Sequence, residues 1–107
     1  TVDELERRLA EEPDLRVLDV RRPGEYAAGH VPGAISVPLD RLAREWPPSG
    51  PPTAVICAGG YRSSAASSLL EAHGLAGLVN VVGGTSAWVA SGRGVESGAQ
   101  PAAGTRS

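Results

Sequence analysis

Short apolar runs alternate along this chain with stretches of helical spacing. Four of the runs predict buried strands, and they lie at 17–20, 34–37, 54–57 and 80–82. Helical segments are expected around and between them, at 1–12, 25–28, 39–45, 62–73 and around Trp88. Strands that alternate with helices are typical of a parallel sheet covered on both faces. The pattern therefore predicts an α/β fold.

Proline, glycine and capping residues mark where the segments end. Thr1 and Glu4 have the spacing of a capping box, and Pro13 ends the helix that this box opens. Residues 47–52 form a stiff, proline-rich connector that cannot join the interior of a sheet. From Glu96 onward the chain is rich in small and polar residues, which cannot build a core. We therefore expect one domain over residues 1–95 and a flexible tail over 96–107.

Composition and charge exclude several classes of function. The chain has 107 residues, 41% of them hydrophobic, and a net charge of −2. Its ten basic residues are all arginine, so Schiff-base chemistry and a P-loop lysine are excluded. The balance is mildly acidic, with no basic stripe for nucleic acid. No apolar run approaches the roughly 20 residues of a membrane helix. We expect a soluble protein that binds neither nucleic acid nor membrane.

The strongest chemical signal lies directly after the third predicted strand. Cys57 ends that strand, Gly59 and Gly60 permit unusual backbone angles, and a helix begins near Arg62. Backbone N–H groups, the helix N-terminus and the arginine would all stabilise a thiolate, so the pKa of Cys57 is expected below its free value of about 8.5. A buried cysteine acting as a small hydrophobe is the alternative, but it needs neither the glycines nor the arginine.

The sequence Cys57-x-x-Gly60-x-Arg62-Ser63 resembles the active-site loop of the rhodanese (sulfurtransferase) family. Three further stretches resemble motifs of the same family in the same order, and together the four span residues 2–96. They are Leu18-Asp19-Val20-Arg21 with Glu25-Tyr26, Gly29–Ala34 with Ser36-Val37-Pro38, and Asn80–Gly84 with Ala87-Trp88.

The resemblance implies a three-layer α/β/α domain with a mostly parallel sheet of four to five strands. It also implies that Cys57 takes a sulfane sulfur from a donor such as thiosulfate or a persulfide, and passes it to a thiol or to cyanide. No metal or organic cofactor is required. The residues expected to bind the substrate anion are Ala58, Gly59, Gly60, Tyr61, Arg62 and Ser63. Arg62 either seats the donor's oxygens or braces the loop.

Other residues have structural and functional interpretations. Asp19 and Arg21 are expected to form a buried ion pair rather than a catalytic acid and an anion binder. For His30 a hydrogen bond that fixes its loop is favoured over acid–base catalysis. Tyr61 either lines the mouth of the pocket or packs outward. Four residues separate Cys57 from Arg62, whereas cysteine phosphatases of related fold have five, so phosphatase or arsenate reductase activity ranks below sulfur transfer.

A second hypothesis is a sulfur-relay or interaction domain within a larger protein. The chain lacks methionine and begins at its first helix, which favours a segment of a longer chain. The family includes fusions to metallo-β-lactamase-like domains, and Gly60-Tyr61-Arg62-Ser63 is similar to loops found in them. A non-catalytic scaffold is less expected, because such relatives commonly lose the cysteine. Composition favours a bacterial protein, and the lone thiol weakly favours the cytoplasm.

Overall fold

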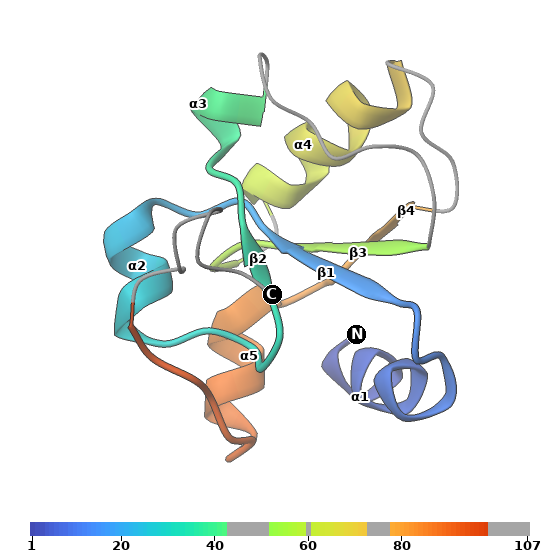
Figure 1. Ribbon diagram of the computed structural model, residues 1–107, viewed down its shortest axis with the longest axis vertical. Coiled ribbons are helices and arrows are strands. Elements are labelled where there is room, and N and C mark those ends of the chain that lie inside the picture. The colour runs from blue at the N-terminus through green and yellow to red at the C-terminus, as the bar shows by residue number, and fades with distance from the viewer. Residues whose placement is uncertain (43–51, 60, 73–77, 99–107) are drawn as a thin grey trace.

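The fold is built on a parallel sheet, as seen in a computed structural model that describes residues 1–42, 52–59, 61–72 and 78–98 (Figure 1). Its four strands are β1 (Arg16–Asp19), β2 (Ile35–Ser36), β3 (Thr53–Ile56) and β4 (Leu78–Asn80). The order across the sheet is β2-β1-β3-β4, and every neighbouring pair is parallel. The predicted α/β fold with a parallel sheet is thus confirmed.

Helices cover both faces of the sheet. They are α1 (Val2–Glu11), α2 (Pro23–Ala28), α3 (Leu39–Leu42), α4 (Tyr61–Ala72) and α5 (Gly84–Ala90). In Figure 1, α3 and α4 lie on one face and α1 and α5 on the other, with α2 beside the sheet. Because α3 and α4 share one face, they pack against each other, as do α1 and α5.

Alternation along the strands divides the core into two clusters. Ala54 and Ile56 of β3 face α1 and α5, where they pack with Leu5 and Trp88. Val55 and Cys57 point to the opposite face, since successive side chains of a strand alternate, and belong to the cluster that includes residues of α3 and α4. The position of Cys57 in the strand pattern therefore places its thiol on the α4 side of the sheet.

Several element boundaries differ from the predicted ones. The capping box of Thr1 and Glu4 is present and opens α1 as expected. β2 has two residues rather than four, because the backbone leaves the sheet before Pro38. β4 begins and ends two residues earlier than predicted. Residues 43–45 of the predicted third helix, nearly all of the proline-rich connector and the expected helix end at 73–74 lie outside the described residues.

The end of the described chain is bonded to the loop before β2. His30 and Glu96 exchange two backbone hydrogen bonds of 2.8 and 2.9 Å, the Glu96 carboxylate accepts from the Gly33 amide, and Gly98 N–H donates to Ala27. The predicted boundary at residue 95 therefore falls too early, because sequence composition does not register backbone pairing. The remainder of the predicted tail, 99–107, lies outside the described residues.

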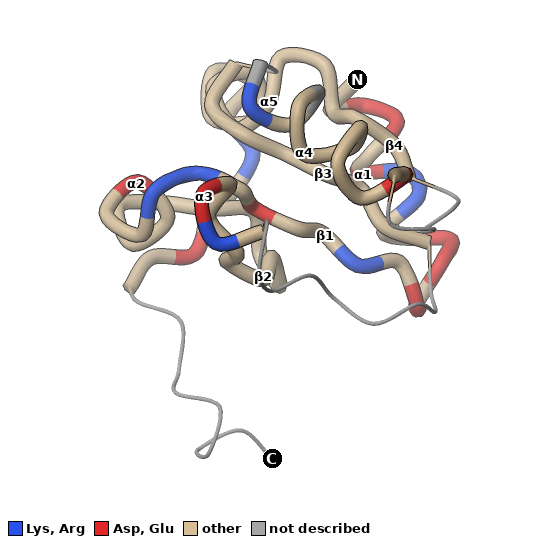
Figure 2. The backbone as a smooth tube through the Cα atoms, turned by 90° about the horizontal axis from the view of Figure 1, so that it is seen from above, with Lys and Arg blue, Asp and Glu red and all other residues tan. Residues whose placement is uncertain are grey.

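Charge and hydropathy on the described chain are evenly spread. Figure 2 shows acidic and basic positions interspersed around the fold rather than gathered on one side. None of the helices that the structure describes has the length and apolar character needed to cross a membrane.

Candidate active site

Cys57 lies at the carboxyl end of β3, where the middle of the sheet meets the start of α4. Val20, which follows β1, donates its N–H to the carbonyl of Ile56 at 3.0 Å and so closes the sheet directly beside the cysteine. The Cys57 residue is 1% exposed and packs in the same buried cluster as Val20, Ala66 and Leu70. Ligands of open parallel sheets bind at the carboxyl ends of strands, so this is the expected edge for a site.

The start of the loop after Cys57 is fixed by the N-terminus of α5. Thr85 N–H donates to the Cys57 carbonyl at 2.7 Å, and Ser86 N–H donates to Ala58 at 3.0 Å. Gly84 makes this approach possible, because a Cβ on it would lie only 2.2 Å from the Cys57 carbonyl oxygen. Its φ of +58° also lies in the left-handed region that favours glycine. The second glycine of the closing motif therefore serves the cysteine loop.

Ser63 joins the thiol to β4. It lies in the first turn of α4, is fully buried, and has its Oγ 3.5 Å from Cys57 Sγ. The same hydroxyl makes a short hydrogen bond to Oδ1 of Asn80, the last residue of β4. Three side chains from β3, α4 and β4 are thus linked in a row at one edge of the sheet.

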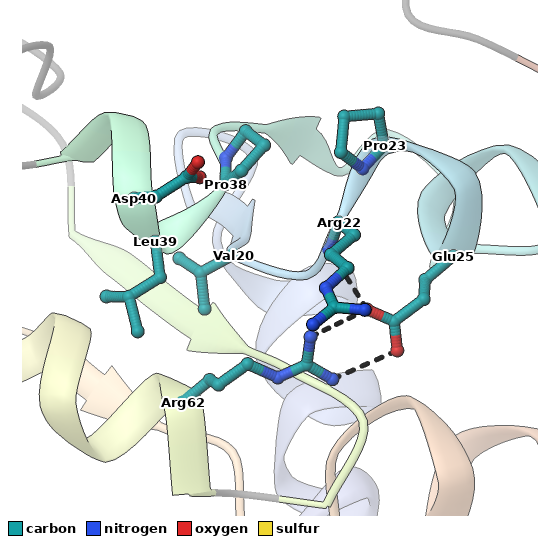
Figure 3. A pocket seen from close by; sticks show the side chains of 8 residues that line it. All are labelled: Val20, Arg22, Pro23, Glu25, Pro38, Leu39, Asp40 and Arg62. Carbon is teal, nitrogen blue, oxygen red and sulfur yellow. Dashed lines mark hydrogen bonds and ion pairs between the residues drawn. The ribbon is translucent and has the colours of Figure 1, made fainter.

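Arg62 makes a two-pronged ion pair with Glu25 of α2 (Figure 3). Its two terminal nitrogens lie 2.6 and 3.0 Å from the two carboxylate oxygens, and Glu25 also accepts from the Arg22 amide. The hydrogen bond from Arg62, together with the Arg22 amide and nearby arginine charge, lowers the pKa of Glu25 to about 2, although burial opposes this. The pKa of Arg62 is raised chiefly by the hydrogen bond to Glu25, with smaller contributions from the negative charges of Glu25, Cys57 and Asp19. Of the two expected roles of Arg62, this geometry favours bracing the loop.

A cavity of about 990 Å³ opens beside this ion pair. Figure 3 shows Arg22, Glu25 and Arg62 along one side of it and Asp40 on the other. Val20 lines the cavity and also packs in the cluster that holds Cys57. The cavity therefore lies next to the cysteine loop and has charged groups of both signs on its walls.

The predicted supporting residues lie around the end of β1. Asp19 is fully buried and accepts two hydrogen bonds from the Arg21 guanidinium, 2.7 Å being the shortest contact. Arg21 also donates to the Gly29 carbonyl at 2.8 Å, so the pair joins the strand end to the next loop. His30 stacks on Tyr26 with 3.7 Å between ring centroids, and its Nδ1 lies 2.7 Å from the Tyr26 carbonyl. These contacts match the structural interpretation of all three residues.

The structure brings together some predicted site residues and adds others. Cys57, Ala58, Arg62 and Ser63 lie at the site, and Gly59 is exposed beside them. Gly60 and the side chain of Tyr61 lie outside the described residues. The sequence analysis gave no role to Glu25 or to Asn80, although both fall within the quoted motifs. A search for an acidic partner to Arg62 would have identified Glu25, whereas nothing in the sequence pairs Asn80 with Ser63.

Metal ligands do not gather anywhere in the described part of the chain. No group of three or more His, Cys, Asp or Glu side chains there has a geometry that could hold a metal ion. The groups available for chemistry at the site are therefore the thiol, the hydroxyl, the amide and the ion pair.

The ion pair between Glu25 and Arg62 is expected to make stability depend on acid. Because the pKa of Glu25 is about 2 in the folded protein and 4.5 ordinarily, the stabilisation is present above pH 4.5 and is lost as the pH falls towards 2. Both side chains are about one-third exposed, so after screening we expect Glu25→Gln to lose about 1 kcal/mol at pH 7. Urea unfolding of both proteins from pH 7 to 2 measures the difference, which should vanish at the acid end. Glu12→Gln, which breaks a more exposed pair with Arg8, is the control and should cost less.

Comparison with known proteins identifies the family. A family model described as a rhodanese-like domain matches residues 1–91. A sulfurtransferase of Allochromatium vinosum is 30% identical over 92 residues, which are 84% of this chain and 86% of that protein. The crystal structure of a rhodanese-like domain protein from Staphylococcus aureus superposes with a TM-score of 0.78 at 36% identity, covering 89% of this chain and 92% of that one. This chain belongs to the rhodanese-like domain family.

Some relatives are longer than this chain. A Bacillus subtilis protein named as a candidate sulfur carrier, YrkF, is 29% identical over 91 residues, which are 82% of this chain but 49% of that protein. The chain spans about half or less of the length of several curated relatives that it matches. The relatives include both sulfurtransferases and sulfur carriers, which makes small sulfur compounds the shared substrate class.

Proposed function

We propose that this chain is a sulfurtransferase whose Cys57 carries the transferred sulfur as a persulfide. The observation that carries the proposal is the placement of the chain's single cysteine at the carboxyl end of β3, directly before α4, in a chain that matches the rhodanese-like domain over residues 1–91. A thiol there meets the partial positive charge of a twelve-residue helix and the full charge of Arg62.

The first half-reaction loads the cysteine. The Cys57 thiolate attacks the outer sulfur of thiosulfate, the sulfur–sulfur bond of the donor breaks, and its electron pair leaves with sulfite. The thiol proton has gone to solvent beforehand. Because Cys57 is 1% exposed, it favours a donor that offers a slender terminal sulfur. The product is an anionic persulfide on Cys57, which backbone N–H groups of residues 58–62 are expected to hold.

The second half-reaction discharges it. An acceptor thiolate or cyanide attacks the terminal sulfur, the sulfur–sulfur bond on Cys57 breaks, and its electron pair returns to Cys57 as the thiolate. The acceptor leaves as a persulfide or as thiocyanate, and no external oxidant or reductant is consumed. The cavity of about 990 Å³ beside Arg62 gives such an acceptor room next to the loop. The ion pair with Glu25 keeps Arg62 in place while sulfur is exchanged.

A sulfur-relay domain is the second candidate. In that case the Cys57 persulfide passes to a partner protein or domain instead of a small acceptor. The observation in its favour is that the chain spans about half of the relative named as a candidate sulfur carrier. Both functions share the loading step and differ in the preferred donor and acceptor.

Intact-mass measurement tests the loading step. The purified chain is weighed before and after incubation with thiosulfate, and again after a reductant is added. We expect a gain of one sulfur atom, about 32 Da, which the reductant reverses. The control is Cys57→Ser, which keeps the size of the side chain and should gain nothing.

The donor separates the two candidates. A gain with glutathione persulfide but not with thiosulfate would favour the relay function. No gain from either donor, while iodoacetamide still alkylates Cys57, would contradict the enzyme proposal and leave the family membership standing.

A further inference from the structure

The row of Cys57, Ser63 and Asn80 has a fixed direction of proton donation. Oδ1 of an amide can only accept, so the short contact requires the Ser63 hydroxyl to donate to Asn80. That hydroxyl has a single proton, which is therefore not available to Cys57. The 3.5 Å contact is then made by the thiol S–H donating to Ser63 Oγ. In this arrangement every donor points away from the sulfur.

A thiolate requires the opposite direction. Sγ without its proton can only accept, and the hydroxyl of Ser63 is the polar side-chain group recorded at 3.5 Å from it. If Ser63 turned its proton to the sulfur, Oδ1 of Asn80 would lose its donor in a partly buried position, which is unfavourable. A half-turn of the Asn80 amide resolves this, because its NH₂ group then donates to Ser63 Oγ while Ser63 donates to sulfur.

We propose that Asn80 is a positioning residue that reverses this row of hydrogen bonds, accepting from Ser63 when Cys57 is a thiol and donating to Ser63 when the sulfur is an anion. An amide can do both, because it carries an acceptor and a donor at its two ends. A carboxylate can only accept, and it would hold the Ser63 proton away from the sulfur. An apolar side chain would leave Ser63 free to donate to sulfur in either state.

Charged neighbours act on the same sulfur and must be separated from this effect. Arg62 of α4 interacts electrostatically with Cys57 and with Asp19 of β1. Arg62 is in turn held by Glu25 of α2. On the other packed element, α3, Asp40 and Arg41 are the charged residues. None of these is changed by a substitution at Asn80, so each is constant across the variants below.

The test uses the pH profile of alkylation of the single thiol by iodoacetamide. Asn80→Asp is expected to move its midpoint upward by about one pH unit, which is about a tenfold slower reaction below the midpoint. Asn80→Leu, which matches the asparagine in size but has no polar atom, is expected to leave the midpoint unchanged or lower. A purely structural role of Asn80 would disturb the leucine variant at least as much, and that result would overturn the proposal.

A second pair of variants separates proton direction from charge repulsion. Ser63→Ala removes the hydroxyl that donates to the anion and is expected to raise the midpoint by itself. In that background Asn80→Asp should add less than half of its effect in the native chain, because no Ser63 proton remains to be held. Full additivity of the two shifts would mean that the aspartate acts by its charge alone, and would refute the reversal.

The consequence for catalysis rests on the proposed function, but the alkylation profile does not. Persulfide formation in the native chain together with equal profiles for Asn80→Asp and the native chain would remove the role of Asn80 and keep the enzyme. The reverse outcome would keep the role of Asn80 and remove the enzyme. Thermal unfolding of each variant confirms that the profile comes from folded protein, and Ser63→Ala retains the test if the aspartate variant does not fold.

Discussion

Asp19→Ala is expected to lower the free energy of unfolding by about 3–5 kcal/mol, because it leaves the guanidinium of Arg21 buried without its counter-charge. The Arg21 side chain is only 7% exposed and would keep the Gly29 carbonyl as an acceptor. The Arg21 backbone N–H would also lose its bond to the Asp19 carboxylate. Urea denaturation at pH 7 measures the loss.

An exposed pair of the same chemistry provides the control. Asp3 of α1 binds Arg93 at 2.7 Å, but its own side chain is 85% exposed. Asp3→Ala removes an aspartate–arginine contact of the same length without leaving a buried charge, so its cost should be far smaller. Equal losses for the two variants would mean that burial does not decide the strength of the Asp19–Arg21 pair.

Gly84→Ala is expected to destabilise the fold by about 3 kcal/mol or more, since it combines a left-handed backbone with a clash. The added Cβ would lie 2.2 Å from the carbonyl oxygen of Cys57 and 2.7 Å from that of Ala58. Backbone atoms cannot turn aside as a flexible side chain can, so α5 and the cysteine loop must separate. Urea unfolding reports the stability, and the rate of Cys57 alkylation reports the loop.

Gly92→Ala separates the two contributions. Gly92 has a φ of +81° but no heavy atom within 4 Å of the position of an added Cβ. Its substitution should therefore carry only the backbone cost of about 1–2 kcal/mol and leave the alkylation rate unchanged. A Gly84 variant with the same stability and thiol reactivity as the Gly92 variant would show that the close approach is relieved without cost.

Much of the fold could be predicted because its signals are local. Apolar runs identified the strands, and the threonine and glutamate of a capping box identified the start of α1. The alternation of Val55 and Cys57 with Ala54 and Ile56 is also encoded in the run itself. These features depend on residues close together in the chain, which is the information that periodicity contains.

The parts that escaped prediction depend on distant pairing. The bridge between His30 and Glu96 joins residues far apart in the chain, and backbone groups make it whatever their side chains are. For the same reason the short β2 was overestimated, since its neighbours Val37 and Ala34 are apolar but lie outside the sheet ladder. Composition alone does not distinguish an apolar loop residue from a strand residue.

The site was predicted in its nucleophile and less fully in its surroundings. Cys57 and Arg62 could be singled out because a thiol, glycines and an arginine rarely coincide at the start of a helix without a reason. The partners Glu25 and Asn80 come from α2 and β4, and only the folded arrangement brings them to the loop. The contacts that position a reactive group are thus harder to predict than the group itself.

The lengths of the four strands bear on how copies of the chain meet one another. The four-residue strands β1 and β3 occupy the middle of the sheet, and the strands at its two described edges have two and three residues. Open edges can recruit strands from other molecules, and long flat edges do so most readily. Edges this short present few backbone donors and acceptors, so edge-to-edge aggregation is disfavoured without any charged residue being assigned to prevent it.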